Sequence, residues 1–163
     1  MFPLGGDLLA IYLQDHLAGS TGGLELARRA RGSNDGTRYG DFLAQLEREL
    51  AEDREALHDL MERLDVGEHR VKVALAWAAE KAGRLKLNGR LTGYSPLSRL
   101  VEVEALMAGV TGKLSGWRSL RALAERDQRL DPVELDRLIA RAERQLSSLA
   151  EHQRQAAGEA LPG

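Results

Sequence analysis

Cysteine is absent from this chain of 163 residues, and aromatic residues make up only 4% of it. The absence of cysteine excludes disulfide scaffolds, thiolate metal sites and cysteine nucleophiles, and it is compatible with a reducing compartment. The longest uncharged apolar stretches, such as 73–79, are far too short to span a bilayer, and the first residues lack the basic start of a secretion signal. We therefore expect a protein of the bacterial cytoplasm with no membrane segment.

A strong excess of one charge is also lacking. The formal net charge of −2 gives no general reason to expect nucleic acid as a partner. Charge is nevertheless partitioned, because residues 41–65 contain nine acids and three arginines, whereas residues 67–99 contain seven basic residues and two acids. We interpret this partition as compensation between two neighbouring helices. The alternative is a basic patch for an anionic ligand, formed by Lys72, Lys86, Arg90 and Arg99.

Apolar residues recur with helical spacing along nearly the whole chain, and the alternation typical of strands never persists. Ser95 and Asp131 are good N-cap residues, and each is followed by a proline at the first helical position. We predict a single all-α domain over residues 1–163. Its five helices are expected at about 7–30, 39–64, 68–87, 97–127 and 131–157.

The connections between the first four predicted helices are short, and short connections favour antiparallel neighbours. The fold that we predict is an antiparallel four-helix bundle with an additional C-terminal helix. That last helix is apolar on one face at its start and turns polar over residues 151–155. We expect its end to fray or to contact a second copy of the chain, which would make the protein a homo-oligomer.

Glycines recur on one face of the first and fourth predicted helices. Each glycine inside a helix costs about 1 kcal/mol relative to alanine, and a close approach of two helices would offset that cost. Local bending of long helices is the alternative. We expect the two helices to touch along the faces that carry Gly19, Gly22, Gly23, Gly109, Gly112 and Gly116.

One acid interrupts a seam of leucines in the second predicted helix. Positions alternately three and four residues apart from Leu43 to Leu64 are all leucine except one, which is Asp53. A carboxylate at such a position is costly unless it is paired, hydrogen-bonded, bound to a metal or reached by water. Asp53 therefore needs a partner from elsewhere in the fold.

Polar residues also lie on apolar stripes near the middle of the other bundle helices. We interpret them as a buried polar network that fixes the register of the helices. Asp53 and Glu104 are expected to point inward and to lie close to each other or to a shared partner from the first or third helix. The three remaining histidines, His58, His69 and His152, are expected to be solvated. The predicted network consists of Asp15, His16, Asp53, Glu80, Lys81, Arg84 and Glu104.

The alternative for the same residues is a carboxylate site for iron or manganese, as found in some helical bundles. Its candidate ligands are His16, Asp53, Glu80 and Glu104, with Asp15 beside them. The Glu-x-x-His pairs of such sites are missing from the buried stripes, and the link at 65–70 is too short for a ferritin-type crossover. We therefore expect no cofactor, with iron or manganese only under this alternative.

Four stretches carry a resemblance: YLQDHLAG at 12–19, ELARR at 25–29, WAAEKAGRLKLNG at 77–89 and YSPLSRL at 94–100. They resemble a family of bacterial helical-bundle proteins that is loosely associated with ferritin-like folds and has no assigned reaction. The resemblance covers roughly residues 7–125 and implies a helical bundle. Neither the resemblance nor the residues point to an enzyme, so we expect a non-enzymatic protein that works by binding or association.

Overall fold

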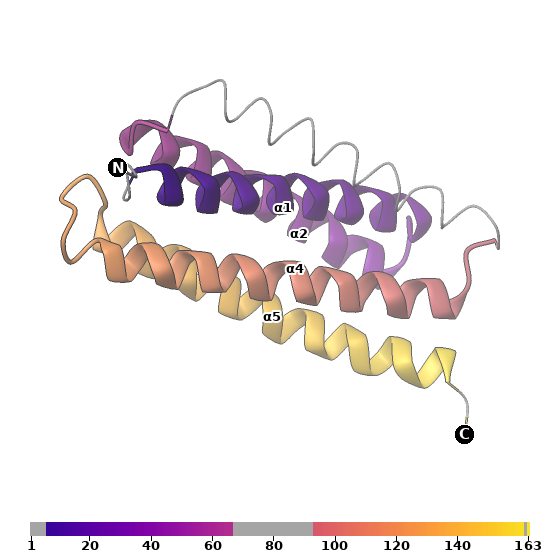
Figure 1. The fold of residues 1–163 in the computed structure, drawn as a ribbon. Helices are drawn as coiled ribbons and strands as arrows, with labels where there is room; N and C mark the ends of the chain where they lie inside the picture. Colours follow the sequence, from indigo (N-terminus) through magenta and orange to yellow (C-terminus); the bar gives the residue numbers. More distant parts are fainter. Residues whose placement is uncertain (1–5, 67–92, 162) are drawn as a thin grey trace.

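The structure, a computed structural model of the chain, describes residues 6–66, 93–161 and 163. These residues form four helices and no strand, which confirms the all-α prediction for this part of the chain (Figure 1). The helix predicted at about 68–87 lies outside the described residues. The helices are α1 (Gly6–Ser33), α2 (Arg38–Arg63), α4 (Pro96–Leu123) and α5 (Pro132–Ala160).

The helices begin where side chains satisfy the free N–H groups of the first turn. The Ser95 side chain accepts a hydrogen bond from the Ser98 backbone, and the Ser98 side chain accepts one from the Ser95 backbone, so the two residues form a capping box. The Asp131 carboxylate accepts a hydrogen bond from the Val133 backbone at 2.9 Å. Both start signals in the sequence are therefore confirmed.

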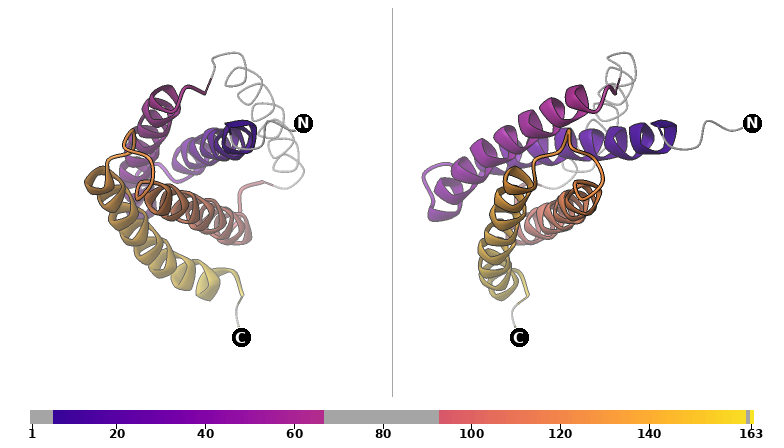
Figure 2. Two further views of the ribbon diagram at one scale, coloured as in Figure 1. Left: turned by 60° about the vertical axis from the view of Figure 1, so that its left-hand side comes forward. Right: turned by 90° about the vertical axis from the view of Figure 1, so that its left-hand side faces the viewer.

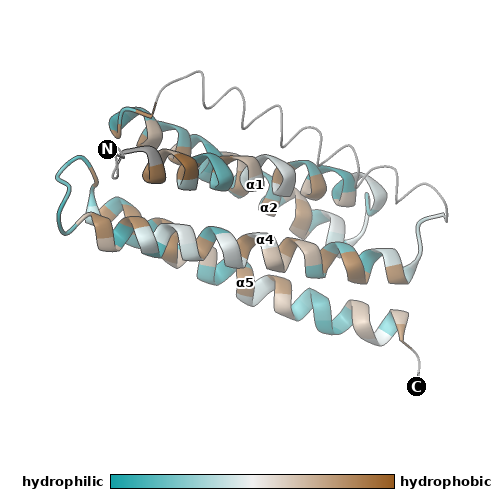
Figure 3. Ribbon diagram, viewed as in Figure 1, coloured by the Kyte–Doolittle hydropathy of each residue, from teal (hydrophilic) through white to brown (hydrophobic). Residues whose placement is uncertain are grey.

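Helix α1 packs against α2 and α4, and α4 packs along α5 (Figures 1 and 2). The predicted contact between the first and fourth predicted helices is thus confirmed as the contact of α1 with α4. Hydrophobic and hydrophilic residues alternate along each of these helices, as expected for helices that bury one face (Figure 3). None of the described helices has both the length and the apolar character of a membrane span. The largest fully buried side chains include Leu13, Leu17, Leu43, Leu46, Leu60, Met61, Leu106, Leu120, Leu135 and Leu149.

The turn between α1 and α2 is tight and is tied to the start of α4. A Cβ atom at Gly40 would lie 2.2 Å from the carbonyl oxygen of Asn34, so only glycine fits there. The buried Asn34 side chain donates to the Ala30 carbonyl at 2.7 Å and accepts from Arg99 Nε at 3.0 Å. This asparagine therefore connects the end of α1 with α4.

The end of α5 is held by its own chain. His152 packs against the rings of Phe42 and Tyr39, with ring centroids 4.2 and 5.3 Å apart, and Arg99 forms an ion pair with Glu159 at 2.8 Å. The prediction that this end frays is wrong, because one of its faces packs on α2 and α4. The prediction of a solvated His152 is also wrong, and burial lowers the pKa of its imidazole despite the opposing charge of Glu151.

Candidate functional site

Asp53 is buried in the contact between α2, α4 and α5, with a side chain that is only 2% exposed. Its Oδ2 atom accepts a hydrogen bond from Lys113 Nζ of α4. Its Oδ1 atom lies 2.7 Å from Arg141 Nη2 of α5, an ion pair without the alignment of a hydrogen bond. Each oxygen of this carboxylate therefore faces a cation.

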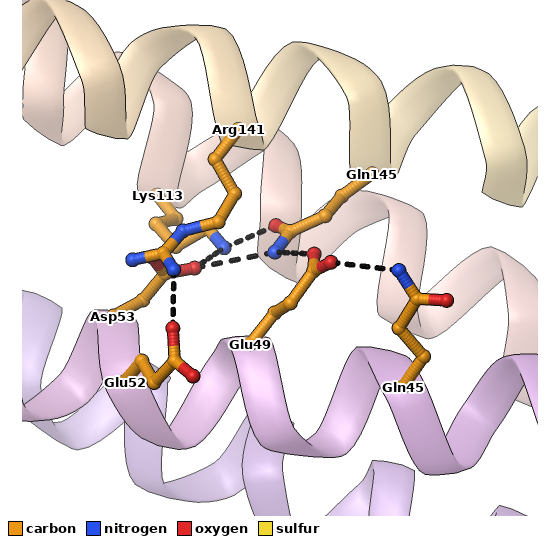
Figure 4. Close-up of polar contacts among 7 residues, drawn as sticks. All are labelled: Gln45, Glu49, Glu52, Asp53, Lys113, Arg141 and Gln145. Atoms are coloured by element: carbon orange, nitrogen blue, oxygen red, sulfur yellow. Dashed lines mark hydrogen bonds and ion pairs between the residues drawn. The ribbon is translucent and has the colours of Figure 1, made fainter.

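An amide side chain bonds to both the lysine and the carboxylates of this cluster. The buried Gln145 of α5 accepts a hydrogen bond from Lys113 Nζ, and it donates to Glu49 Oε2 at 2.9 Å and to Asp53 Oδ2 at 3.3 Å (Figure 4). We call Glu49, Asp53, Lys113, Arg141 and Gln145 the charge network. At its edge, Arg141 also pairs with Glu52 at 2.6 Å, and Gln45 donates to Glu49 at 3.1 Å.

The surroundings change the proton affinities of two members of the charge network. Burial lowers the pKa of the Lys113 ammonium, although the carboxylate of Asp53 opposes this effect. Burial alone would raise the pKa of Glu49, but hydrogen bonds from Gln145 and Gln45, together with nearby arginine charges, bring it below its ordinary value. For Lys113 the cost of burial thus outweighs the effect of its partners, whereas for Glu49 the hydrogen bonds and charges outweigh the cost of burial.

The other predicted network residues lie elsewhere. Glu104 is exposed on α4 and accepts a hydrogen bond from Gln153 at 3.3 Å, so the prediction that it points inward beside Asp53 is wrong. The reason is the rotation of α4, whose buried stripe passes through Val103 rather than Glu104. Asp15 is exposed as well, which contradicts its predicted burial. The predicted members Glu80, Lys81 and Arg84 lie outside the described residues.

Sequence reasoning missed Gln145, although the sequence contains a signal for it. The buried residues of α5 include Leu135, Leu138, Ala142, Gln145 and Leu149, which are alternately three and four residues apart. Gln145 thus interrupts an apolar seam as Asp53 does in α2. Two interrupted seams could have been matched to each other. Lys113 is marked in the same way, because it continues the alternating spacing of Val103, Leu106, Val110, Trp117 and Leu120 on α4, whereas nothing comparable marks Arg141.

A pocket of about 220 Å³ lies between α1, α2 and α4, directly beside the charge network. Asp53 and Lys113 belong to both the network and the pocket wall. The pocket is lined mainly by apolar side chains and by glycines. Its apolar lining includes Leu13, Leu50, Leu57, Leu106, Val110, Trp117 and Leu120, and its polar lining includes Asp15, His16 and Ser20.

The glycines on the facing sides of α1 and α4 open this pocket. Among the residues that the structure describes, a Cβ atom at Gly19, Gly22, Gly23, Gly109 or Gly112 would meet no atom within 4 Å. At Gly116, in contrast, a Cβ atom would lie 2.8 Å from His16 Cε1. Within this part of the chain, close approach therefore explains only Gly116, where the neighbour is a side chain. For the other five glycines the prediction of a close approach is wrong.

His16 forms part of the pocket wall. Its ring rests on Gly116 and meets the ring of Tyr12 edge-on, with the centroids 4.5 Å apart. Burial lowers the pKa of the imidazole, although the charge of Asp15 opposes this effect. His16 thus presents an uncharged ring to the pocket at neutral pH.

Substitution of two of these glycines should have opposite effects. We expect Gly112→Ala to raise the free energy of unfolding by about 0.5–1 kcal/mol, because it adds helix propensity without a clash. Gly116→Ala should lower it by about 1–3 kcal/mol, because its methyl group would overlap the His16 ring. Urea unfolding measures both values, and equal effects of the two substitutions would contradict the described pocket.

The lowered pKa of His16 predicts a loss of stability in mild acid. Below its ordinary value of 6.5, the unfolded chain binds a proton at this residue more readily than the folded chain does. The free energy of unfolding should therefore fall as the pH is lowered from about 7 through 6.5 to the folded-state pKa. Urea unfolding of the parent and of His16→Phe tests this. The variant should lose less stability over that range, and an unchanged pH dependence would assign the effect to other groups such as His152.

One group of possible metal ligands is close together within the described ranges. It consists of His58, Asp59 and Glu62 on the outer side of α2, with His58 Nδ1 3.7 Å from Glu62 Oε1. None of these residues belongs to the predicted metal site. Asp53 does not suit a metal ion, because Lys113 and Arg141 already occupy the surroundings of its oxygens.

Comparisons with known proteins add no relative. No protein-family model, no curated protein and no solved structure matches this chain.

Proposed function

We propose that this protein is a non-enzymatic binding module that holds a small molecule in the pocket between α1, α2 and α4. The observation that carries the proposal is a pocket of about 220 Å³ with mainly apolar walls beside a closed network of charges. A cavity of about 150 Å³ is sufficient for benzene, so this pocket suits a molecule of roughly two fused rings. Apolar pockets with few polar groups are typical of small-molecule sites.

The charge network would give this site a rigid wall. Asp53 of α2, Lys113 of α4 and Gln145 of α5 bond to one another, so the three helices are linked at one level. Two of these residues also line the pocket. A wall that is ordered before the ligand arrives lowers the entropy lost on binding.

The polar groups of the pocket support binding rather than catalysis. A serine or tyrosine nucleophile needs a neighbouring base. The Ser20 hydroxyl donates to the carbonyl of Leu17 at 2.7 Å, and the Tyr12 hydroxyl donates to Ser119 at 3.0 Å. Among the described residues, neither hydroxyl is thus bonded to a histidine or a carboxylate.

The proposal includes the predicted architecture, an antiparallel four-helix bundle with an additional C-terminal helix in a cytoplasmic protein. The contacts of α1 with both α2 and α4 support it, as does the short turn between α1 and α2. A homo-oligomer formed through α5 is the assembly that we propose, and light scattering tests it.

The second proposal from the sequence is a ferritin-like bundle that binds iron or manganese. The surroundings of Asp53 disfavour this metal site, because an ammonium and a guanidinium group lie where a metal ion would have to bind. Metal analysis of protein purified without a chelating tag decides the matter. Stoichiometric metal would favour this second proposal over the binding module.

Binding of naphthalene tests the proposed function. We expect a dissociation constant on the order of 0.1–1 mM for a fragment of this size, measured from NMR shift changes of pocket residues. Gly112→Leu should abolish these changes, because its side chain would occupy the pocket. Gly158→Leu is the matched control, since Gly158 is an open helical glycine of α5 that does not line the pocket. Equal binding by both variants, or none by the parent, would refute the proposed site.

A further inference from the structure

The wall of the pocket also indicates what kind of molecule it takes. We propose that the ligand is an uncharged ring compound of about ten non-hydrogen atoms that accepts a hydrogen bond from His16. This inference rests on the proposed function, because it concerns the ligand of the same pocket. It follows from the volume of the pocket, from the charged residues of its wall and from the hydrogen-bond donors that the wall offers.

The volume limits the size of the ligand. A benzene ring occupies a cavity of about 150 Å³, and the pocket is larger by about half, at about 220 Å³. Gly109 and Gly112 have no close neighbour among the described residues, which allows a flat ring to lie against the backbone of α4. Two fused rings therefore match the volume of the pocket.

The charge balance of the wall disfavours an ionic ligand. Lys113 is 13% exposed and is already paired with Asp53, so an anion would gain little from it and would also face Asp15 at the pocket wall. A cation would find Asp53 already placed between Lys113 and Arg141. Removing an ion from water without a dedicated partner is costly.

The polar groups of the wall offer donors. His16 lines the pocket, and its ring makes no hydrogen bond within the described segments of the chain. A neutral imidazole carries one N–H, and contacts with Tyr12 and Gly116 fix its ring in place. Lys113 uses two of its three N–H groups for Asp53 and Gln145. A ligand that carries an acceptor therefore suits the site.

A matched pair of ring compounds tests this inference. Naphthalene and quinoline have the same shape, but only quinoline carries a ring nitrogen that accepts a hydrogen bond. We expect quinoline to bind the parent protein about three- to tenfold more tightly than naphthalene does at neutral pH. His16→Phe keeps an aromatic ring against Tyr12 and should remove this preference, so that the variant binds quinoline no more tightly than naphthalene. The anion naphthoate should bind more weakly than either neutral compound.

The outcomes separate the two proposals. If naphthalene and quinoline bind equally well, or if naphthoate binds best, the inferred ligand class is wrong while the proposed function stands. A preference for quinoline that persists in His16→Phe would show that another group is the donor and would overturn the assignment to His16. If none of the compounds binds, the proposed function itself fails. Imidazole ¹⁵N shifts of His16 in the parent should change more with quinoline than with naphthalene, because only quinoline accepts its N–H, and this keeps the test valid if His16→Phe does not fold.

Discussion

Replacing Asp53 with leucine is expected to lower the free energy of unfolding by about 3–5 kcal/mol. The substitution leaves Lys113, whose side chain is only 13% exposed, and Arg141 without the carboxylate that both contact. Leucine is close to aspartate in length and continues the leucine seam of α2, so the unpaired cations dominate the effect. Urea unfolding of the parent and the variant measures the difference.

Two further variants isolate the cause of this loss. Adding Lys113→Met to Asp53→Leu should recover most of the lost stability, because the stranded ammonium is removed together with its partner. Glu52→Gln, at the exposed edge of the network, should change the free energy of unfolding by less than about 1 kcal/mol. A higher stability of Asp53→Leu than of the parent would contradict the described network.

Gly40→Ala should lower the free energy of unfolding by about 2–4 kcal/mol. Its methyl carbon would lie 2.2 Å from the carbonyl oxygen of Asn34, and a backbone atom has little freedom to move away. The substitution should also loosen the hydrogen bond between Asn34 and Arg99 that connects this turn with α4. Thermal and urea unfolding measure the loss of stability.

Gly32→Ala is the control for this substitution. Gly32 lies in the last turn of α1, and a Cβ atom there would meet no described residue within 4 Å. We expect a gain of up to about 1 kcal/mol from the added helix propensity. A similar response of the two glycine positions would show that the α1–α2 turn is looser than described.

The helices were predictable because their signals are local. Apolar periodicity and the N-cap residues Ser95 and Asp131 placed the described helices to within a few residues of their ends. The position of Asp53 in a leucine seam likewise showed that it needs a partner. The identity of that partner is not a local property, because it depends on how α4 and α5 are rotated toward α2. A change of one residue turns a helix by about 100°, which separates the exposed Glu104 from the buried Val103.

The glycines show a second limit of sequence reasoning. Their spacing places Gly109, Gly112 and Gly116 near one side of α4, and the contact of α4 with α1 was predicted from it. Spacing does not reveal the distance between two helices, however. The side chain of His16 fills the gap at Gly116, whereas no described residue fills the gap at Gly112. The pocket could therefore be recognised only from the three-dimensional arrangement.

A crystal structure of the chain grown with saturating quinoline tests most directly whether the charge network and the pocket form one ligand site. We predict quinoline between α1, α2 and α4, with its ring nitrogen within hydrogen-bond distance of His16 and with Lys113 still bonded to Asp53 and Gln145. Quinoline bound elsewhere, or a pocket filled by the protein's own side chains in such crystals, would contradict the proposed ligand site.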